Sequence, residues 1–403
     1  MITLAAIFGL FLIGLWIASR IEEQPNVIAK VYTQRGRWFY LKYCLITCML
    51  FLVRMKYYVY GKRRYHKDED MDKLHELSNH DQAFDAVFFQ AVSQNGIYIC
   101  TGTERRHGGK LNGLVYIVHP EYGVLESLKL PKTELNADVV SLLNKKSYSG
   151  EGISFTPIVP MKKWKMSYNG LMRIQNDPTK LVQVKLEADW TSNYDWFFVE
   201  IDVPISTIAR CMAVEVWTRQ FFQNLKEAHQ SHYEQMGYVN GTLQIDGKLT
   251  SLVDIDAFRD HSFGHKRDWS LMHRYIYCMF YLSDRTKISL GVISHHGLMT
   301  HLELGFVSHP DGRIDPIESI DLRLYEHAEN GVLPEEFEFT FESAGKSYDV
   351  KMKFAYEAKH YKGSNDEAVM NERFHVCEVN GITGKGISEW HYNKNMFKTE
   401  AVD

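Results

Sequence analysis

The sequence lacks the motifs that mark several common classes of enzyme and binding protein. It holds six cysteines but no pair at CxxC spacing, which argues against a disulfide framework and favours a reduced, cytosolic environment for the globular part. It has neither a GxxxxGK[ST] loop for nucleotide phosphates nor an HExxH zinc motif. The net charge of −4 provides no basic field for nucleic acid. The sequence therefore predicts no cofactor, no metal and no nucleic-acid partner.

The first nineteen residues carry no charged side chain and are mostly apolar. As a helix they would be about 28 Å long, close to the hydrocarbon thickness of a bilayer. A cleaved signal peptide is the competing interpretation. However, no basic residue precedes Arg20, and Trp16-Ile17-Ala18 lacks the small residue expected three positions before a cleavage site. We therefore predict an uncleaved transmembrane anchor over residues 1–19.

A basic region with a second, shorter apolar run follows over residues 20–83. Residues 43–53 carry no charge, but this run is too short to span a bilayer unaided. It is either a short second span or a helix that lies in the membrane interface, and we prefer the second interpretation. Basic residues on both sides are typical of a cytosolic flank. The predicted location is the membrane, in one pass or two, with the globular part in the cytosol and membrane lipid as a partner.

From residue 84 the pattern is that of β-strands. The apolar run of residues 86–92 is followed by a turn ending in Gly96, which predicts a hairpin. Trp164, Met166 and Tyr168 alternate with polar residues, and the following Asn169-Gly170 predicts a second hairpin turn. Similar runs recur to residue 395. The predicted fold class is therefore mainly β, with two antiparallel barrels or sandwiches.

One segment breaks the strand pattern. Apolar residues at spacings of three and four predict a helix over residues 206–230. This helix would join a first β half, residues 84–205, to a second β half, residues 231–395. Residues 396–403 would form a tail.

The densest cluster of functional groups is the segment Arg259–Trp269, RDHSFGHKRDW. It lies between two strand-like runs and combines carboxylates, imidazoles, cations, a hydroxyl and an indole. Asp260 beside apolar side chains would have a raised pKa and could protonate a double bond or an epoxide, with His261 sharing the task. Alternatively, Arg259 or Arg267 neutralises Asp260, and the cluster only fixes a strand connection.

Aromatic side chains suit the wall of an apolar pocket with a few polar groups. Glu378 and Glu389 lie at strand-like positions, where a solvated face is the default interpretation. The predicted catalytic residues are Asp260 and His261, and the predicted ligand-binding residues are Trp164, Tyr168, Tyr233, Glu234, Arg259, Arg267, Trp269 and Trp390.

Five segments carry a resemblance to a known group of proteins: residues 160–170 (PMKKWKMSYNG), 232–235 (HYEQ), 241–247 (GTLQIDG), 259–269 and 380–392 (NGITGKGISEWHY). In this order they resemble the motifs of lipocalin-like double-barrel proteins similar to the AttH, carotenoid hydratase and tocopherol cyclase families. The chain also resembles the N-terminal region of animal phosphoenolpyruvate-synthase-like proteins.

The resemblance covers about residues 84–395 and implies two calycin-type barrels around an apolar cavity, with Asp260 and His261 near the pocket. Phe263 stands where the pattern usually has Trp, and His265-Lys266 is inserted before Arg267. Members with known chemistry act on isoprenoid lipids.

Three functions follow as alternatives. The first is a membrane-anchored lipocalin-like protein that binds an apolar ligand, a lipid or an isoprenoid. The second is an enzyme, a hydratase, cyclase or isomerase that acts on such a lipid by acid–base chemistry. The third is a non-catalytic scaffold with filled barrels, since a shared fold does not by itself transfer a reaction.

Overall fold

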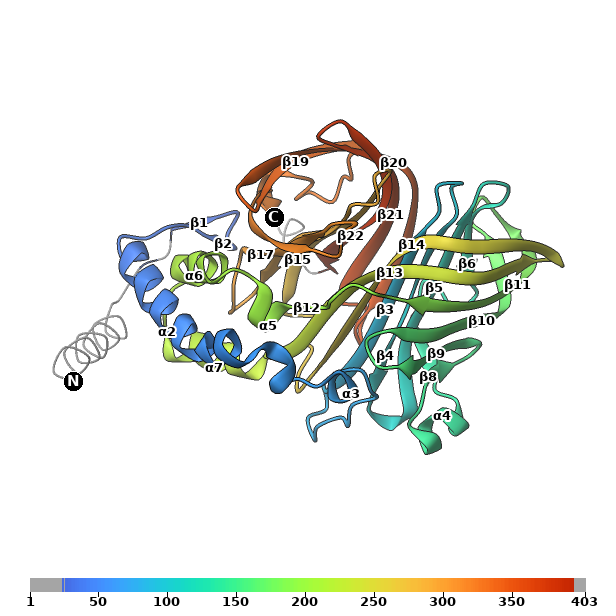
Figure 1. Ribbon diagram of the computed structural model, residues 1–403, viewed down its shortest axis with the longest axis horizontal. Helices are drawn as coiled ribbons and strands as arrows, with labels where there is room; N and C mark the ends of the chain where they lie inside the picture. The colour runs from blue at the N-terminus through green and yellow to red at the C-terminus, as the bar shows by residue number, and fades with distance from the viewer. Residues whose placement is uncertain (1–23, 25, 395–403) are drawn as a thin grey trace, which may run out of the picture.

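The computed structural model describes residues 24 and 26–394 (Figure 1). β-Strands dominate these residues, in two large antiparallel sheets and a small hairpin of β1 (Val27–Ile28) and β2 (Tyr32–Thr33). The predicted mainly β class is confirmed. The predicted anchor, residues 1–19, and the predicted tail, residues 396–403, lie outside the described residues.

The first sheet forms a ring around a filled core. Its strands pair in the order β11-β13-β14-β3-β4-β5-β6-β10, and β10 also pairs with β11, which joins the two ends of this path. Trp164, Tyr168 and Trp190 lie in the core. The strands are β3 (Phe84–Val92), β4 (Tyr98–Arg106), β5 (Lys110–His119), β6 (Gly123–Ser127), β7 (Glu134–Asn136), β8 (Tyr148–Gly150), β9 (Ile153–Val159), β10 (Lys163–Ile174), β11 (Asp177–Thr191), β12 (Phe197–Phe198), β13 (Gln230–Ile245) and β14 (Lys248–Gly264).

The second sheet is a closed barrel in which each strand pairs with the next along the chain and β15 pairs with β22. Its interior is filled by side chains that include Phe280, Phe339 and Trp390. The strands are β15 (Met272–Leu282), β16 (Lys287–His295), β17 (Leu302–Ser308), β18 (Ile314–Asp321), β19 (Glu336–Ser343), β20 (Lys346–Lys362), β21 (Ala368–Val379) and β22 (Ile382–Asn393).

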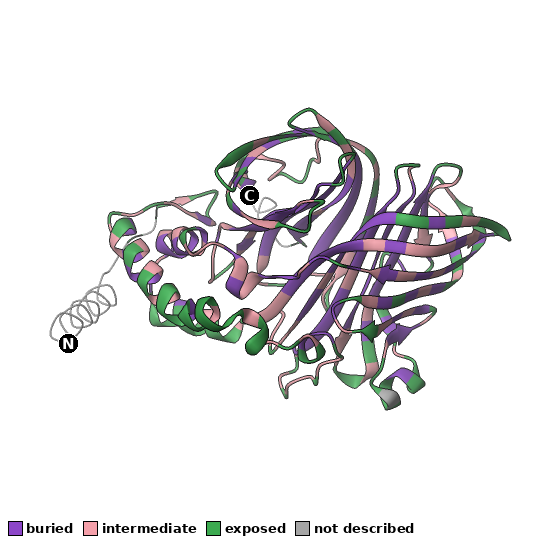
Figure 2. Cartoon of the chain, viewed as in Figure 1, coloured by how far each residue is buried: buried purple, intermediate pink, exposed green. Residues whose placement is uncertain are grey.

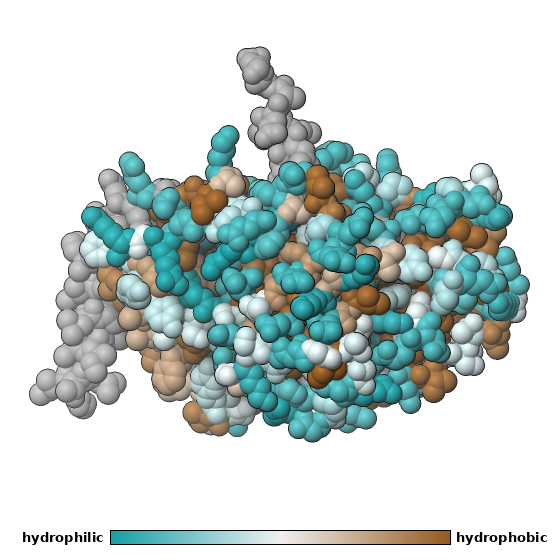
Figure 3. All heavy atoms as spheres, turned by 90° about the horizontal axis from the view of Figure 1, so that it is seen from above, coloured by the Kyte–Doolittle hydropathy of each residue, from teal (hydrophilic) through white to brown (hydrophobic). Residues whose placement is uncertain are grey.

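The two sheets share a third apolar core where they meet. Along β15, Ile276 and Phe280 belong to the barrel interior, whereas Tyr275, Tyr277 and Met279 belong to a cluster that includes side chains of β3, β4 and β14. Successive side chains of a strand point to opposite faces, so β15 is apolar on both faces and buried along most of its length (Figure 2). By contrast, the outer face seen in Figure 3 is mostly hydrophilic.

The boundary between the sheets differs from the predicted division into residues 84–205 and 231–395. Strands β13 and β14 pair with β11 and β3, so they complete the first sheet, and the second begins only at β15. The helical segment is an insertion between β12 and β13 of one sheet rather than a link between two units. The sequence marked this interruption of the strand pattern, but which strands pair across it depends on contacts distant along the chain.

Two local predictions have different outcomes. The hairpin turn before β4 is confirmed, because the amide of Gly96 donates to the carbonyl of Ser93. Asn169-Gly170 is not a turn but lies within β10, which pairs with β11 from Lys163 to Ile174 and turns only after Ile174. The pairing of both residues with Lys185 and Val184 of β11 overrides their local turn preference.

The predicted helix over residues 206–230 is two helices, α6 (Ile205–Val214) and α7 (Arg219–Glu227). The break occurs where Thr218 accepts a hydrogen bond from the amide of Phe221, at 3.0 Å, and so caps a new helix. Shorter helices are α3 (Asp68–Met71), α4 (Val139–Asn144) and α5 (Val199–Asp202), with 3-10 turns η1 (Lys62–Arg64), η2 (His107–Gly109) and η3 (Leu324–Glu326).

The second apolar run of the sequence lies in α2 (Phe39–Tyr60). Leu45 and Ile46 pack against Ala209 and Met212 of α6 and against Trp217, which follows that helix. In the part of the chain that the structure describes, no helix combines the length and the apolar character needed to cross a membrane.

Candidate functional site

A cavity of 660 Å³ lies between the two sheets. Its lining comes from β3, β4, β5, β13 and β14 of the first sheet, from β15, β16, β17, β20 and β22 of the second, and from α5 and the end of α7. Most of the wall is apolar, with Phe88, Leu114, Phe258, Met279 and Leu304 among its residues. A cavity of this size and character can hold a small organic molecule. The resemblance implied two barrels around an apolar cavity. Both sheet cores are filled, and the cavity lies where the two sheets meet rather than inside either one.

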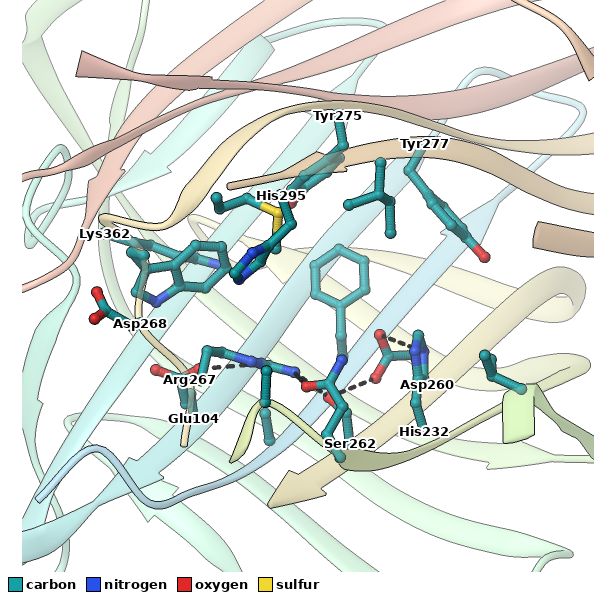
Figure 4. Close-up of a pocket in the computed structure, with 18 of the residues that line it drawn as sticks. Glu104, His232, Asp260, Ser262, Arg267, Asp268, Tyr275, Tyr277, His295 and Lys362 are labelled. Carbon is teal, nitrogen blue, oxygen red and sulfur yellow. Dashed lines mark hydrogen bonds and ion pairs between the residues drawn. The ribbon is translucent and has the colours of Figure 1, made fainter. Parts of the chain in front are cut away.

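One wall of the cavity carries an imidazole between two carboxylates. Figure 4 shows one of these contacts, between His232 and Asp260. His232 Nε2 lies 3.3 Å from Glu234 Oε1 and 3.5 Å from Asp260 Oδ2. His232 and Glu234 are two apart on β13 and so share a face, and Glu234 is the cross-strand partner of Asp260 on β14. The three side chains meet because the two strands pair in this register.

This arrangement fixes charge. Burial lowers the pKa of His232, but the carboxylates of Asp260 and Glu234 outweigh burial and raise that pKa to about 10. Burial raises the pKa of Asp260, but the neighbouring His232 and Arg267 outweigh burial and hold that pKa below its ordinary value. At neutral pH the wall therefore carries an imidazolium and an ionised Asp260, the opposite of the protonated carboxyl predicted at this position.

The second barrel supplies hydroxyl groups to the same wall. The hydroxyl groups of Tyr277 and Ser289 donate to the two carboxylate oxygens of Glu234. Tyr277 stands on β15 and Ser289 on β16, so these hydrogen bonds cross from one sheet to the other. They hold Glu234 in one orientation and fix the two sheets relative to each other at the cavity.

A second polar group lies near the connection from β14 to β15. Arg267 Nη1 lies 3.1 Å from Glu104 Oε2, and Arg267 Nη2 donates to Ser262 Oγ at 2.9 Å (Figure 4). Burial raises the pKa of Glu104, but Arg106 and Arg267 outweigh burial and lower that pKa to about 2. Trp269 and Lys362 line the cavity beside this pair. In this group the charges of Arg267 and Glu104 neutralise each other, and the Trp269 ring lies beside the pair.

Glu389 is a carboxyl group of the cavity lining whose pKa is raised. Burial raises the pKa of Glu389 to about 6, while Lys362 and a 3.0 Å hydrogen bond from the Tyr275 hydroxyl partly offset burial. Its cross-strand partner on β21 is Glu372, which is buried. Burial and repulsion from Glu389 raise the pKa of Glu372 well above its ordinary value. Glu389, expected on a solvated face, instead titrates close to neutral pH at the cavity wall.

Glu372→Gln is expected to stabilise the protein by roughly 2 kcal/mol at pH 8, because the buried carboxyl there must either hold a proton or carry a charge, and both cost free energy, whereas an amide does neither. Because the folded-state pKa of Glu372 is raised, the folded state holds its proton more tightly than the unfolded state. Stability therefore falls as pH rises above the unfolded value of 4.5 towards the folded pKa. Urea unfolding at pH 4.5 and pH 8 measures the effect, which should appear only at the higher pH. Glu378→Gln, on the exposed face of the same strand, is the control, and equal midpoints for both variants at pH 8 would refute the prediction.

The structure separates the two residues predicted to act together. Asp260 and His261 are neighbours in β14, so their side chains point to opposite faces. Asp260 faces the cavity, whereas His261 is fully buried inside the first sheet. Of the predicted ligand-binding residues, Glu234, Arg267 and Trp269 line the cavity. Trp164, Tyr168, Tyr233 and Arg259 lie on the inner side of the first sheet, and Trp390 lies inside the second.

The inward-facing residues form a buried polar network of their own. Arg259 Nη1 lies 2.6 Å from Asp72 Oδ1, and the Tyr233 hydroxyl donates to the same oxygen at 2.9 Å. His261 is hydrogen-bonded to Tyr233 through Nδ1 and to Asp85 through Nε2, at 2.8 and 2.9 Å. The network joins the segment around Asp72 to the first sheet. The alternative that Arg259 only fixes structure fits these contacts, although its partner is Asp72 and not Asp260.

Several residues of the site were not among the sequence candidates: His232, Glu104, Tyr275, Tyr277, Lys362 and Glu389. The motif of residues 232–235 contained the useful signal, because a strand there places His232 beside Glu234 on one face. Glu389 had no such signal, because its position at the cavity wall depends on how the second sheet packs beside the first.

Comparisons with known proteins agree with this fold. The model of a family of unknown function (DUF8627) matches residues 4–392. A search of curated proteins finds no significant match. Among solved structures, the chain is similar to a putative AttH from Nitrosomonas europaea, at 10% identity and a TM-score of 0.50, over 76% of this chain and 91% of that chain. It is also similar to kievitone hydratase from Nectria haematococca, at 12% identity and a TM-score of 0.47, over 78% and 90%. The AttH likeness confirms the predicted resemblance for the fold alone.

Proposed function

We propose that this chain, which belongs to the family of unknown function (DUF8627), is an enzyme that binds an apolar small molecule in the cavity between its two sheets and catalyses proton transfer on it. The reaction class is that of a hydratase, cyclase or isomerase. The ligand class is the one expected from the sequence, a lipid or an isoprenoid, and the largely apolar wall supports it.

One observation carries the proposal: two carboxyl groups of the same cavity have pKa values displaced in opposite directions. Asp260 is held ionised beside the His232 imidazolium, whereas Glu389 keeps its proton to about pH 6. The two groups influence each other, because the charge of Asp260 contributes to the raised pKa of Glu389. A pair of titratable groups displaced in this way is typical of sites that use one group as acid and another as base.

The roles follow from these protonation states. Glu389 donates a proton to one carbon of an isolated double bond, and the positive charge that develops on the other carbon is stabilised by the carboxylates of Asp260 and Glu234. In a hydration, water forms the new carbon–oxygen bond and its proton passes to Asp260. In an isomerisation or cyclisation, an adjacent carbon loses its proton to Asp260 instead. The aromatic residues Phe88, Phe258 and Trp269 would hold the apolar substrate.

A scaffold function is disfavoured by the cavity itself. Both sheet cores are filled, as that alternative required, but 660 Å³ remains between them and is lined by ionisable groups. A surface that only presents a partner-binding face has no need of an internal space of this size.

Solvent-deuterium incorporation tests the proposed activity. Full-length protein is incubated in deuterium oxide with a panel of unsaturated isoprenoids, and mass spectrometry detects deuterium bound to carbon. Ala86 lines the cavity, so Ala86→Phe is expected to abolish both incorporation and the capture of apolar compounds from an extract. Leu249→Phe, an exposed change on the same strand as Asp260, should affect neither. The proposal would be contradicted if the wild-type protein incorporated no deuterium and captured no more apolar compound than Ala86→Phe.

A further inference from the structure

Helix α2 has its charged and apolar side chains in the reverse of the usual arrangement. Lys42 and Arg54 are buried, and they donate hydrogen bonds to the carbonyls of Glu215 and Val203. The exposed side of the helix is almost entirely apolar, and Lys56 is its one exposed charge in the described helix. A surface helix of a globular protein normally places its charges outwards. The exposed side of α2 therefore needs an apolar or mixed environment to be stable.

The exposed residues form one continuous stripe along the helix. Tyr40, Cys44 and Cys48 are spaced four apart, and the stripe continues through residues 51–53 to Tyr60. Leu52 and Val53 expose 54% and 56% of their surface. The stripe, called here the α2 stripe, consists of Tyr40, Cys44, Cys48, Phe51, Leu52, Val53, Met55, Tyr58, Val59 and Tyr60.

Basic residues flank the α2 stripe at both ends. Arg35 and Arg37 precede the helix and Arg64 follows it, and all three are exposed. None of them forms an ion pair with a residue that the structure describes; Arg35 and Arg64 lie over the rings of Phe39 and Tyr60. An exposed apolar and aromatic surface with unpaired cations beside it suits the surface of a bilayer that contains anionic lipid.

We propose that the α2 stripe binds the surface of a bilayer that contains anionic lipids, with the helix lying in the plane of the interface. Its apolar side chains would enter the boundary between headgroups and acyl chains, while Arg35, Arg37 and Arg64 pair with lipid phosphates. A protein partner would require complementary acidic groups at both ends, whereas an anionic membrane supplies them everywhere. The uncharged run of residues 1–19 precedes this region in the sequence. The proposal does not depend on the activity proposed for the cavity.

Helix α2 lies close to the cavity, so membrane binding through the α2 stripe would bring the cavity close to the membrane. The inner side of α2 packs in a cluster that includes Leu225 and Met299, and these two residues also line the cavity. A single layer of side chains therefore separates the inner side of α2 from the cavity. Binding through the α2 stripe would hold the cavity wall against the phase in which apolar molecules dissolve.

The natural cysteines allow a direct test. Cys44 and Cys48 are exposed in the α2 stripe, whereas the other four cysteines are buried. Full-length protein with Cys48→Ser is labelled at Cys44 with a polarity-sensitive fluorophore and mixed with vesicles of phosphatidylcholine and phosphatidylserine. The emission is expected to shift to the blue and to be quenched by nitroxide-labelled lipid. Arg35→Gln, Arg37→Gln and Arg64→Gln should each weaken this response about fivefold on the anionic vesicles and leave it unchanged on phosphatidylcholine alone.

A second labelling position controls for tethering elsewhere in the chain. Val253 is exposed on β14, in the hairpin that extends away from α2 (Figure 1). With Cys44→Ser, Cys48→Ser and Val253→Cys, the fluorophore should stay in water whether or not the protein is bound. Absence of quenching at Cys44, or equal quenching at both positions, would overturn the proposal. The proposal would also be overturned if the emission from Cys44 shifted to the blue without vesicles and the shift grew with protein concentration, because a second copy of the chain would then cover the stripe.

Discussion

Glu389→Gln is expected to lower kcat for the proposed proton transfer by roughly 10²- to 10⁴-fold, the range found for a general acid, and to leave ligand affinity largely unchanged. Glutamine keeps the shape of the side chain and can still accept the hydrogen bond from Tyr275, but it has no proton to give. Because burial raises the pKa of Glu389 to about 6, the wild-type rate should fall as pH rises above that value. Deuterium incorporation into the substrate, followed from pH 5 to pH 8, measures both effects.

The same assay distinguishes an acid from a structural residue. Glu378→Gln, exposed on β21, should keep the wild-type rate and pH profile. Repulsion from Glu389 raises the pKa of Glu372, so Glu372 still holds its proton while Glu389 titrates, and Glu372→Gln should leave the pH of the fall in rate unchanged. A rate for Glu389→Gln within the range of the control, or a rate that rises with pH, would show that Glu389 is not the acid.

The mainly β class could be predicted because alternation of side chains is a local property of the sequence. Trp164, Met166 and Tyr168 do alternate along β10, and they are buried in the first sheet. Residues 259–264, expected in a connection between two strands, are instead the end of β14. A register shift opposite residues 239–241 and a positive φ at Asp254 interrupt the alternation before them. An irregularity of this kind hides a long strand from a pattern of period two.

The candidate site could be predicted only in part for a related reason. The segment of residues 259–269 does supply Asp260, Arg267 and Trp269 to the cavity. Its neighbours His261 and Arg259 point to the opposite face. The local sequence does not show whether the polar residues of a strand line a cavity on one face only or on both faces. The partners of Asp260 come from β13, and Glu389 comes from β22. Their meeting depends on how the two sheets pack, and single-sequence periodicity contains no information about that packing.

Asp72→Ala is expected to destabilise the protein by roughly 3–5 kcal/mol, a large fraction of the stability of an ordinary domain. Both side chains of the Asp72–Arg259 ion pair are fully buried, so the substitution leaves the Arg259 guanidinium charged and without its carboxylate. It also removes the acceptor of hydrogen bonds from the Tyr233 hydroxyl and from the Trp164 indole, each at 2.9 Å. Urea unfolding followed by tryptophan fluorescence at pH 7 measures the loss.

The double variant Asp72→Ala with Arg259→Met distinguishes two contributions to the free energy of unfolding: that of the ion pair itself, and the cost of leaving the Arg259 charge buried without a partner. Methionine removes the buried cation and fills most of its volume, so the double variant should recover a substantial part of the loss caused by Asp72→Ala alone. Asp68→Ala breaks a partly exposed pair with Arg63 and should cost less than about 1 kcal/mol.

Burial raises the pKa of Asp72, but Arg259 and His261 outweigh burial and lower that pKa below its ordinary value. The contribution of the pair is therefore present above the unfolded pKa and is lost as pH falls through the folded one. If Asp72→Ala cost no more than Asp68→Ala, the buried network would not be what holds the segment around Asp72 to the first sheet.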